Sequence, residues 1–292
     1  MADIQVAPKE TRTRRPNDYK SDVKPIWCPG CGDYAFLSAF VRALADLNLE
    51  PEKVAIASGI GCSGRFPAFA RAYGYHGVHG RAVPLATGIK LGNPELTVFA
   101  IGGDGDAFSI GAGHLSHAAT RNVDITYVVL DNEIYGLTKG QPSPTTPTGH
   151  RTKASPYGKV GRQANPLMMM LSYGASFVAR GNSTNPRQLT ELIMEAVEHP
   201  GFSFVQVYSP CVTFFDTYPM VKERQAPLPS THDVRDLYNA MKLASDPDHL
   251  YMGVFYRDDA EDNYLSEMVK VSAKAGGGDH QITDLVRKYR IV

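Results

Sequence analysis

Apolar runs alternate with amphipathic segments along much of the chain, and this pattern predicts strands between helices. Residues 33–47 place apolar side chains on one helical face, whereas residues 54–58 are continuously apolar, as in a buried strand. Strands are also expected at residues 96–101, 125–130, 176–179 and 203–208, and helices at residues 65–75, 83–91, 108–121, 167–173 and 186–198. Because strands that alternate with helices form parallel sheets covered on both faces, the sequence predicts a doubly wound α/β fold with a mainly parallel sheet.

The two ends of the chain depart from this alternation. Residues 1–25 are polar and predict an N-terminal arm, and residues 26–215 are expected to form the main domain. After residue 215 the pattern weakens, with a linker signal at 226–229, a helical pattern at 232–244 and a strand pattern at 251–256. We interpret residues 216–292 as a C-terminal extension, which either covers the main domain or contacts a partner.

Composition narrows the class of protein. The 292 residues contain 30 basic and 30 acidic side chains, which argues against a general binder of nucleic acid or anionic membranes. No apolar stretch approaches the length of a membrane span, and the first residues lack the apolar core of a secretory signal. We therefore expect a cytoplasmic protein, in which four cysteines are better explained by a metal than by disulfides.

The four cysteines are spaced like the ligands of one metal site. Cys28 and Cys31 form a C-x-x-C motif, Cys62 follows in Gly-Ile-Gly-Cys-Ser-Gly-Arg, and Cys211 comes much later in Ser-Pro-Cys. Each cysteine lies in a loop that contains glycine or proline, and loops let thiolates from distant segments converge. Four thiolates suit either a structural zinc ion or a 4Fe–4S cluster.

A second motif is typical of a site for magnesium and a diphosphate. Asp104 in Gly-Asp-Gly-Asp (103–106) and Asn132 each follow a predicted strand, and their oxygens are ligands that Mg²⁺ prefers. A backbone carbonyl near Ile134 would add a third ligand. The glycines allow phosphate to approach the backbone, and a helix from Phe108 would offer it free N–H groups. An ordinary turn with Asn132 as a helix cap is the alternative, but the flanking strands favour the metal site.

These two motifs are expected to meet. Cys62, Asp104, Asn132 and Cys211 all follow the end of a predicted strand. In an open parallel sheet, ligands bind at the carboxyl ends of the strands. The sequence therefore predicts that the cysteines and the magnesium motif share one edge of the sheet.

Taken together, the motifs resemble those of the β subunit of 2-oxoacid:ferredoxin oxidoreductases, most closely the 2-oxoglutarate type (2-oxoglutarate synthase). The resemblance covers about residues 25–215 and implies the thiamine-diphosphate-binding type of sheet. The matching segments are Trp-Cys-Pro-Gly-Cys-Gly-Asp (27–33), Gly-Ile-Gly-Cys-Ser-Gly-Arg (59–65), His-Gly-Arg-Ala (79–82) with Ala-Thr-Gly-Ile-Lys (86–90), Gly-Asp-Gly-Asp (103–106) and Asp-Asn-Glu-Ile-Tyr-Gly-Leu-Thr-Lys-Gly-Gln (131–141).

The resemblance implies thiamine diphosphate, Mg²⁺ and one 4Fe–4S cluster on this subunit. Asp104, Asn132 and the carbonyl of Ile134 would hold Mg²⁺. Cys28, Cys31, Cys62 and Cys211 would hold the cluster. The residues expected to contact the cofactor are Ile60, Gly61, Cys62, Ser63, His79, Gly103, Asp104, Gly105, Asp106, Asn132, Ile134, Gly136 and Leu137, whereas Tyr135 is expected to be structural.

The resemblance also suggests where the substrate binds. Arg65 and Lys139 would bind substrate carboxylates; the alternatives are that Arg65 only starts a helix and that Lys139 is solvated. For His79 the alternative to cofactor contact is a core histidine bonded to the backbone. We cannot assign a catalytic carboxylate that activates the aminopyrimidine, because the family places this glutamate on the α subunit.

The implied activity is the coenzyme-A-dependent oxidative decarboxylation of a 2-oxo acid, with electrons passed through the cluster to ferredoxin, and it is reversible as CO₂ fixation. The substrate would be 2-oxoglutarate, with pyruvate or a branched 2-oxo acid left open. The chain would work with an α subunit, as a heterodimer or a dimer of heterodimers. Two alternatives remain: a two-electron thiamine enzyme with structural zinc, and a non-catalytic interaction module stabilised by zinc.

Overall fold

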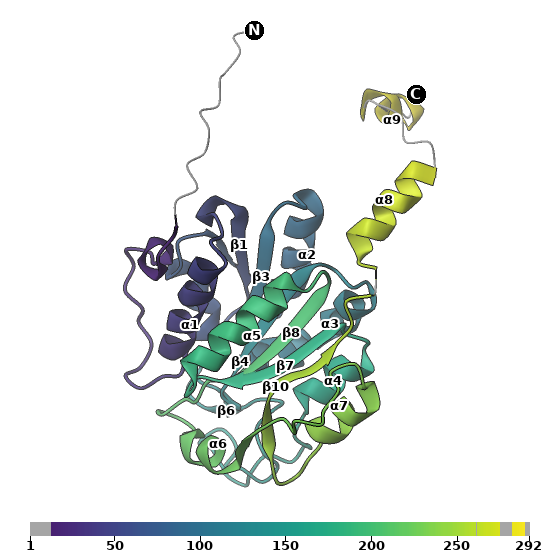
Figure 1. Cartoon of the computed structure of the whole chain (residues 1–292). Coiled ribbons are helices and arrows are strands. Elements are labelled where there is room, and N and C mark those ends of the chain that lie inside the picture. The colour runs from purple at the N-terminus through teal and green to yellow at the C-terminus, as the bar shows by residue number, and fades with distance from the viewer. Residues whose placement is uncertain (1–12, 261, 275–281, 290–292) are drawn as a thin grey trace.

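A mainly parallel sheet runs through the computed structural model, which describes residues 13–260, 262–274 and 282–289. Within these residues, eight strands form one sheet in the order β2-β1-β3-β4-β8-β7-β10-β9 (Figure 1). The strands are β1 (Val54–Ser58), β2 (Tyr73–His76), β3 (Thr97–Gly103), β4 (Ile125–Asp131), β7 (Phe177–Asn182), β8 (Phe202–Tyr208), β9 (Gln225–Pro227) and β10 (Leu250–Arg257), beside a small hairpin of β5 (Ile134–Tyr135) and β6 (Gln141–Pro142).

Neighbouring strands from β2 to β7 are parallel, and β10 is antiparallel to β7. Every residue of β1, β4, β7 and β8 is buried. Continuous burial is expected for parallel strands with helices on both faces, and it explains the consecutive apolar residues Val-Ala-Ile-Ala in β1 and Tyr-Val-Val-Leu in β4. The predicted fold class is therefore confirmed.

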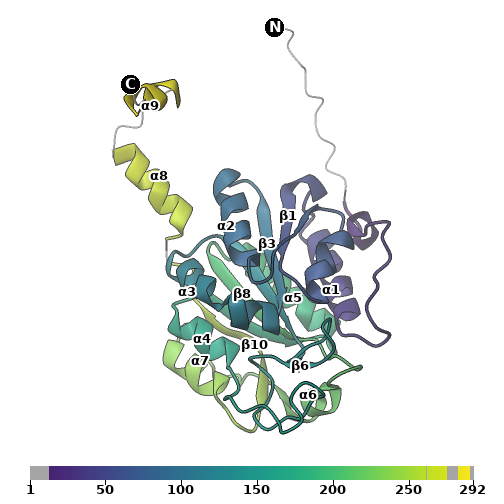
Figure 2. The same cartoon turned by 180° about the vertical axis from the view of Figure 1, so that it is seen from behind.

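Helices cover both faces of the sheet (Figures 1 and 2). The apolar side chains of α1 and α5 form one core with the sheet, and those of α2, α3, α4 and α7 form the other. In β1, Ile56 belongs to the first core, and Ala55 and Ala57 belong to the second. The helices are α1 (Asp33–Asp46), α2 (Ala82–Gly92), α3 (Ala112–Thr120), α4 (Pro166–Ser172), α5 (Pro186–Glu198), α6 (Tyr218–Arg224), α7 (Leu237–Ala244), α8 (Tyr264–Lys274) and α9 (Ile282–Lys288).

Two segments differ from the sequence prediction. The helix expected at 65–75 is a 3-10 turn over Ser63–Ala68 followed by strand β2. Pro67 interrupts the helical hydrogen bonds, and the exposed strand pairs with β1 at the edge of the sheet. The helix expected from Phe108 begins earlier, as a π-helical turn over Asp106–Ile110, before α3.

The C-terminal part continues the sheet. Strand β10 pairs with β7 and β9 pairs with β10, so residues that we assigned to an extension add two strands to the central sheet. The expected helix at 232–244 is shorter, spanning Leu237–Ala244. Helix α8 has no buried residue and runs away from the body (Figure 1). The division at residue 215 stays a prediction, and part of the expected N-terminal arm lies outside the described residues.

The described residues include no helix that is both long and apolar enough to cross a membrane.

Asn122 ties three elements together at the start of β4. Its Oδ1 accepts hydrogen bonds from Ser176 Oγ at 2.6 Å and from the backbone N–H of Phe202 at 2.7 Å. Asn122 is buried and has a left-handed backbone (φ 47°), which asparagine adopts more readily than most residues. One amide side chain thus satisfies donors from the segments that begin β7 and β8.

Replacement of Asn122 with alanine should lower the free energy of unfolding by about 2 kcal/mol, because the buried Phe202 N–H loses its acceptor and the Ser176 hydroxyl keeps only His199 as a partner. Chemical denaturation followed by circular dichroism measures this loss. Asn93→Ala is the matched control, because Asn93 is exposed and accepts only a local backbone hydrogen bond. An equal, small loss in both variants would show that Asn122 does not stabilise the sheet.

Candidate active site

The loops that carry the predicted site residues leave the sheet side by side. β1, β3, β4 and β8 are consecutive neighbours and all parallel, so their carboxyl ends lie at one edge. The loop after β1 carries Cys62, the loop after β3 carries Asp104, the loop after β4 carries Asn132, and the loop after β8 carries Cys211. The expected convergence of the two motifs on one sheet edge is confirmed.

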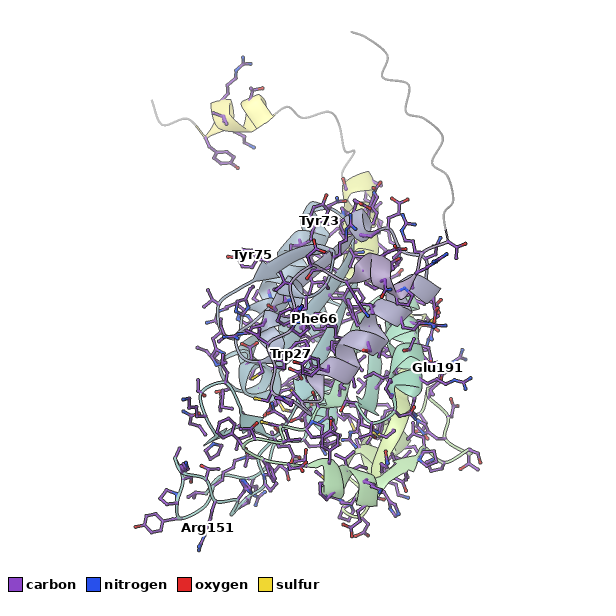
Figure 3. All side chains as sticks on the ribbon, turned by 90° about the vertical axis from the view of Figure 1, so that its left-hand side faces the viewer. Trp27, Phe66, Tyr73, Tyr75, Arg151 and Glu191 are labelled. Carbon is purple, nitrogen blue, oxygen red and sulfur yellow. The ribbon has the colours of Figure 1, made fainter. Side chains whose placement is uncertain are left out.

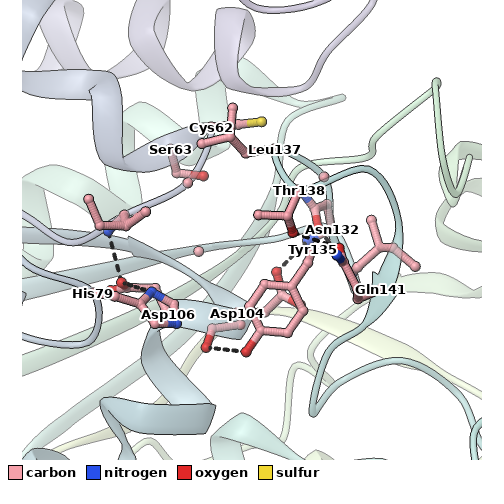
Figure 4. A pocket seen from close by; sticks show the side chains of 16 residues that line it. Cys62, Ser63, His79, Asp104, Asp106, Asn132, Tyr135, Leu137, Thr138 and Gln141 are labelled. Atoms are coloured by element: carbon pink, nitrogen blue, oxygen red, sulfur yellow. Dashed lines mark hydrogen bonds and ion pairs between the residues drawn. The ribbon is translucent and has the colours of Figure 1, made fainter. Parts of the chain in front are cut away.

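A cavity of about 360 Å³ opens at this edge (Figure 4). In the figure, Cys62 and Ser63 lie on one side of the cavity and Asp104 lies on the other. Every residue that we expected to contact the cofactor lines it, from Ile60 to Leu137. Tyr135, which we expected to be structural, also lines it, as do Thr138 and Gln141. All three belong to the matching segment 131–141, which was their signal in the sequence.

Asp104 and Asn132 face the cavity as a pair. Asp104 is almost completely buried, and its Oδ2 lies 2.9 Å from Thr145 Oγ1. Asn132 Oδ1 accepts a hydrogen bond from the Ile134 N–H at 3.0 Å, and this turn brings Ile134 to the cavity wall. Glu133, inside the turn, has the left-handed φ of 58°. The expected three oxygen donors therefore belong to one compact turn and the adjacent strand end.

Buried carboxyl groups concentrate negative charge beside this turn. Burial and the nearby Asp131 raise the pKa of Asp104 to about 8. Burial, together with Asp131 and Asp104, raises the pKa of Glu133 to about 9. Burial also raises the pKa of Asp131, although Gln206 donates a hydrogen bond to it at 2.7 Å. Clustered carboxyl groups that resist ionisation are stabilised by a bound divalent cation, so the donor set fits Mg²⁺.

The backbone around the cavity leaves room for a diphosphate. Gly61 has a φ of 130°, and a Cβ added there would meet no atom within 4 Å. A Cβ on Gly103 would approach only Leu130 O and Ser63 Oγ, both at 3.8 Å. Since both glycines line the cavity, side chains at these positions would occupy its space. At position 105 a glycine is needed because of a protein contact: an added Cβ would stand 2.3 Å from the Tyr135 ring.

Asp106 holds two loops of the site together. Its Oδ1 accepts hydrogen bonds from the N–H groups of Ile60 at 2.9 Å and Gly80 at 2.7 Å. His79 Nδ1 lies 2.9 Å from the same oxygen, without the direction of a hydrogen bond. The carboxylate is thus engaged with protein groups, and its expected contact with a diphosphate stays a prediction.

The cysteine loops meet the cavity at Gly136. A Cβ built on Gly136 would stand 3.6 Å from the Sγ atoms of Cys62 and of Cys211. It would also stand 3.7 Å from Asn132 Nδ2. Because both sulfur atoms stand 3.6 Å from this one point, they are at most twice that distance apart, and they border the turn that carries Asn132.

Cys28 and Cys31 lie in the loop before α1, which contacts the other cysteine loops. Trp27 Nε1 donates a hydrogen bond to Cys62 O at 2.8 Å, and the Gly32 N–H donates to Pro210 O at 3.2 Å. Burial and the nearby Asp33 raise the pKa of Cys31, and they raise that of Cys62 to about 12. Iron bound to the sulfurs would favour the thiolate forms that this environment opposes.

Asp33 is a positioning residue that the sequence analysis missed. Its carboxylate accepts hydrogen bonds from Ser209 Oγ at 2.6 Å and from Ser63 Oγ at 3.4 Å. It therefore joins the loops of Cys31, Cys62 and Cys211. Its position directly after the C-x-x-C motif, at the start of a helix, is the available sequence signal.

No group of three or more His, Cys, Asp or Glu side chains in the described part of the chain stands close enough to hold a single metal ion. Arg65 and Lys139, the expected substrate ligands, are not among the residues that line the cavity. Arg65 is half-buried and its charge influences Cys62, whereas Lys139 is exposed in the loop after β5. Their role in substrate binding stays a prediction.

Comparison with known proteins agrees with this geometry. Residues 53–207 match the family model described as thiamine pyrophosphate enzyme, C-terminal TPP binding domain. Residues 211–273 match the model for the C terminal part of the pyruvate ferredoxin oxidoreductase β subunit. A solved structure of 2-oxoglutarate:ferredoxin oxidoreductase from Magnetococcus marinus, with 2-oxoglutarate, coenzyme A and succinyl-CoA bound, superposes with a TM-score of 0.91 and 41% identity. That match covers 95% of this chain and 97% of the other.

Curated relatives give the same result. The β subunit of 2-oxoacid:ferredoxin oxidoreductase 2 from Aeropyrum pernix is 44% identical over 68% of this chain and 64% of its own length. The 2-oxoglutarate oxidoreductase subunit KorB from Mycobacterium tuberculosis is 42% identical over 72% of this chain and 56% of its own. The chain thus spans less than two thirds of these relatives, but it covers 87% of a β subunit from a Sulfolobus species at 39% identity.

The geometry of the sheet edge, the domain match over residues 53–207 and these relatives agree with one another. The chain belongs to the family of 2-oxoacid:ferredoxin oxidoreductase β subunits.

Proposed function

We propose that this chain, together with an α subunit, catalyses the coenzyme-A-dependent oxidative decarboxylation of 2-oxoglutarate to succinyl-CoA. Electrons would leave through one 4Fe–4S cluster to ferredoxin, and the same catalyst would run in reverse to fix CO₂. The observation that carries this proposal is the position of Gly136, which lies between the sulfurs of Cys62 and Cys211 and the side chain of Asn132. A redox centre and a thiamine centre would thereby adjoin one another.

The choice of 2-oxoglutarate rests on similarity. The solved relative from Magnetococcus marinus was determined with 2-oxoglutarate, coenzyme A and succinyl-CoA, and it matches nearly the whole of this chain. Arg65 and Lys139 are the cations that we propose for the substrate carboxylates. The positive charge of Arg65, close to Cys62, would then face the same region as the cluster.

The proposed roles at the cofactor follow from the donor set. Asp104, Asn132 and the carbonyl of Ile134 would hold Mg²⁺, and Gly103 and Gly105 would lie against the diphosphate. When bound, thiamine diphosphate supplies the electron sink that releases CO₂ from a 2-oxo acid. The chain itself keeps Asp104 buried, orients it through Thr145, and fixes the loops of Ile60 and Gly80 through Asp106.

We expect this chain to work in the cytoplasm, where an α subunit would complete the site. The glutamate that activates the aminopyrimidine is expected on that subunit, so we propose a heterodimer or a dimer of heterodimers. The second chain would bring this glutamate to the cavity at the sheet edge, beside the residues shown in Figure 4.

Loss of the Asp104 carboxylate should weaken thiamine diphosphate binding on the order of 100-fold, because Mg²⁺ loses its only anionic protein ligand in the proposed set. Isothermal titration of the α–β complex with thiamine diphosphate and Mg²⁺ measures the Kd of the Asp104→Ala variant. Asp233→Ala, at an exposed position, is the control. Equal affinities in the two variants would remove Asp104 from the metal site.

The Cys211→Ser variant tests the electron path. If Cys211 holds the cluster, reduction of methyl viologen driven by 2-oxoglutarate and coenzyme A should fall at least about 100-fold, since the electrons lose their route. Thiamine diphosphate binding should stay unchanged, because Cys211 is outside the proposed magnesium donors. Full viologen reduction by Cys211→Ser would remove Cys211 from the electron path.

A further inference from the structure

Positive charge is concentrated in one stretch of this neutral chain. Residues 134–190 contain no aspartate or glutamate. The same stretch contains seven basic residues: Lys139, Arg151, Lys153, Lys159, Arg162, Arg180 and Arg187. Arg180 is buried and Arg187 lies on α5, away from the others in the fold. Four of the seven fall within residues 147–162, and this local excess of positive charge indicates a binding surface for a negative partner.

Residues 147–162 form a loop, here called the basic loop, that projects from the body of the molecule. Figure 3 shows Arg151 at its outer end, far from Trp27 and Phe66. Arg151, Lys153 and Arg162 are exposed. Tyr157 and Val160 are 96% and 94% exposed, so two large apolar side chains stand in solvent among the cations.

The basic loop is held in one shape by its own backbone. The Gly149 N–H donates to Lys159 O at 2.8 Å, and the Lys159 N–H donates to His150 O at 3.0 Å. Gly158 packs so closely on Gly149 that a Cβ would stand 2.6 Å from its carbonyl oxygen, and its φ is 92°. A loop fixed in this way presents its cations in a constant arrangement, which lowers the entropic cost of binding.

The base of the basic loop contacts the segments of both proposed centres. The His150 ring lies on the Phe215 ring, with centroids 4.0 Å apart, and the Phe215 N–H donates to Cys211 O at 3.0 Å. Lys159 Nζ donates to Pro144 O at 2.7 Å and to Thr146 O at 2.6 Å. These carbonyls flank Thr145, which contacts Asp104, so the loop is joined to the cysteine and magnesium segments.

Apolar side chains continue from the basic loop toward the cysteines. Val212 and Phe214 follow Cys211 and are 38% and 39% exposed. A Cβ on Gly30, between Cys28 and Cys31, would touch Val212 at 3.5 Å, and Cys28 itself is exposed. The surface therefore combines Val212 and Phe214, beside the cysteine loops, with the exposed cations of the basic loop, and the stacked rings of His150 and Phe215 join the two parts.

We propose that the basic loop, with Val212 and Phe214, is the docking surface for an acidic electron-carrier protein. This assignment rests on the proposed function, since it needs a cluster at the cysteines. A small protein of negative net charge is steered to fixed cations, and a small apolar centre allows it to dissociate quickly after one electron has passed. Coenzyme A also carries phosphates that such cations would bind, so the test below measures its KM as well.

The test neutralises the exposed cations of the loop in the α–β holoenzyme. The triple variant is Arg151→Gln, Lys153→Gln and Arg162→Gln; Lys159 is left intact because it anchors the loop. The control is Arg121→Gln, Arg187→Gln and Lys242→Gln, which removes the same charge from exposed positions on α5, α7 and the end of α3. Two acceptors are compared: a clostridial-type ferredoxin of negative net charge, and methyl viologen.

In the loop variant, the ferredoxin concentration for half-maximal rate at low salt should rise on the order of tenfold, and its dependence on ionic strength should weaken. Viologen reduction and the KM for coenzyme A should match the control. A ferredoxin response equal to the control overturns the proposal. A raised KM for coenzyme A, or loss of the α subunit on purification, also overturns it and assigns the loop to those partners. If the unsubstituted complex reduces neither acceptor, the proposed function itself fails.

Discussion

Parallel pairing of four neighbouring strands is the constraint on which the site depends. Because β1, β3, β4 and β8 run in the same direction, the loops that follow them emerge together at one edge. Segments far apart in the sequence thereby bring Cys62, Asp104 and Asn132 to one cavity, with Cys211 beside Gly136 in its wall. Asp33 then joins the third cysteine loop to this edge through Ser63 and Ser209.

Several acidic groups at this edge of the sheet resist ionisation. Asp104, Asp131 and Glu133 are buried carboxyl groups with raised pKa values, and the half-buried thiols of Cys31 and Cys62 also have raised pKa values. Each group costs free energy when it ionises alone in this environment. Cations bound at the carboxyl groups and at the thiols would offset that cost. We therefore expect the folded site and its proposed metals to stabilise each other.

The sequence predicted the sheet well because continuous apolar strands and a terminating glycine or proline are local signals. It failed at residues 65–75, where an edge strand pairs through its backbone and the helical pattern of its side chains is overridden. In the site, the motif residues were predictable, but the roles of Asp33 and Thr145 were not; the Thr145 hydroxyl lies 2.9 Å from carboxylate oxygens of both Asp104 and Asp131. Their roles depend on contacts between loops far apart in the sequence, which a single sequence does not reveal.

Metal content tests the central claim that a thiamine site and an iron–sulfur cluster share this edge. The chain would be purified anaerobically with its α subunit, iron and zinc would be counted, and an EPR spectrum would be recorded after reduction with dithionite. Our account predicts about four irons per chain and the signal of a reduced 4Fe–4S cluster. Zinc without iron would contradict it and leave a thiamine enzyme with a structural metal.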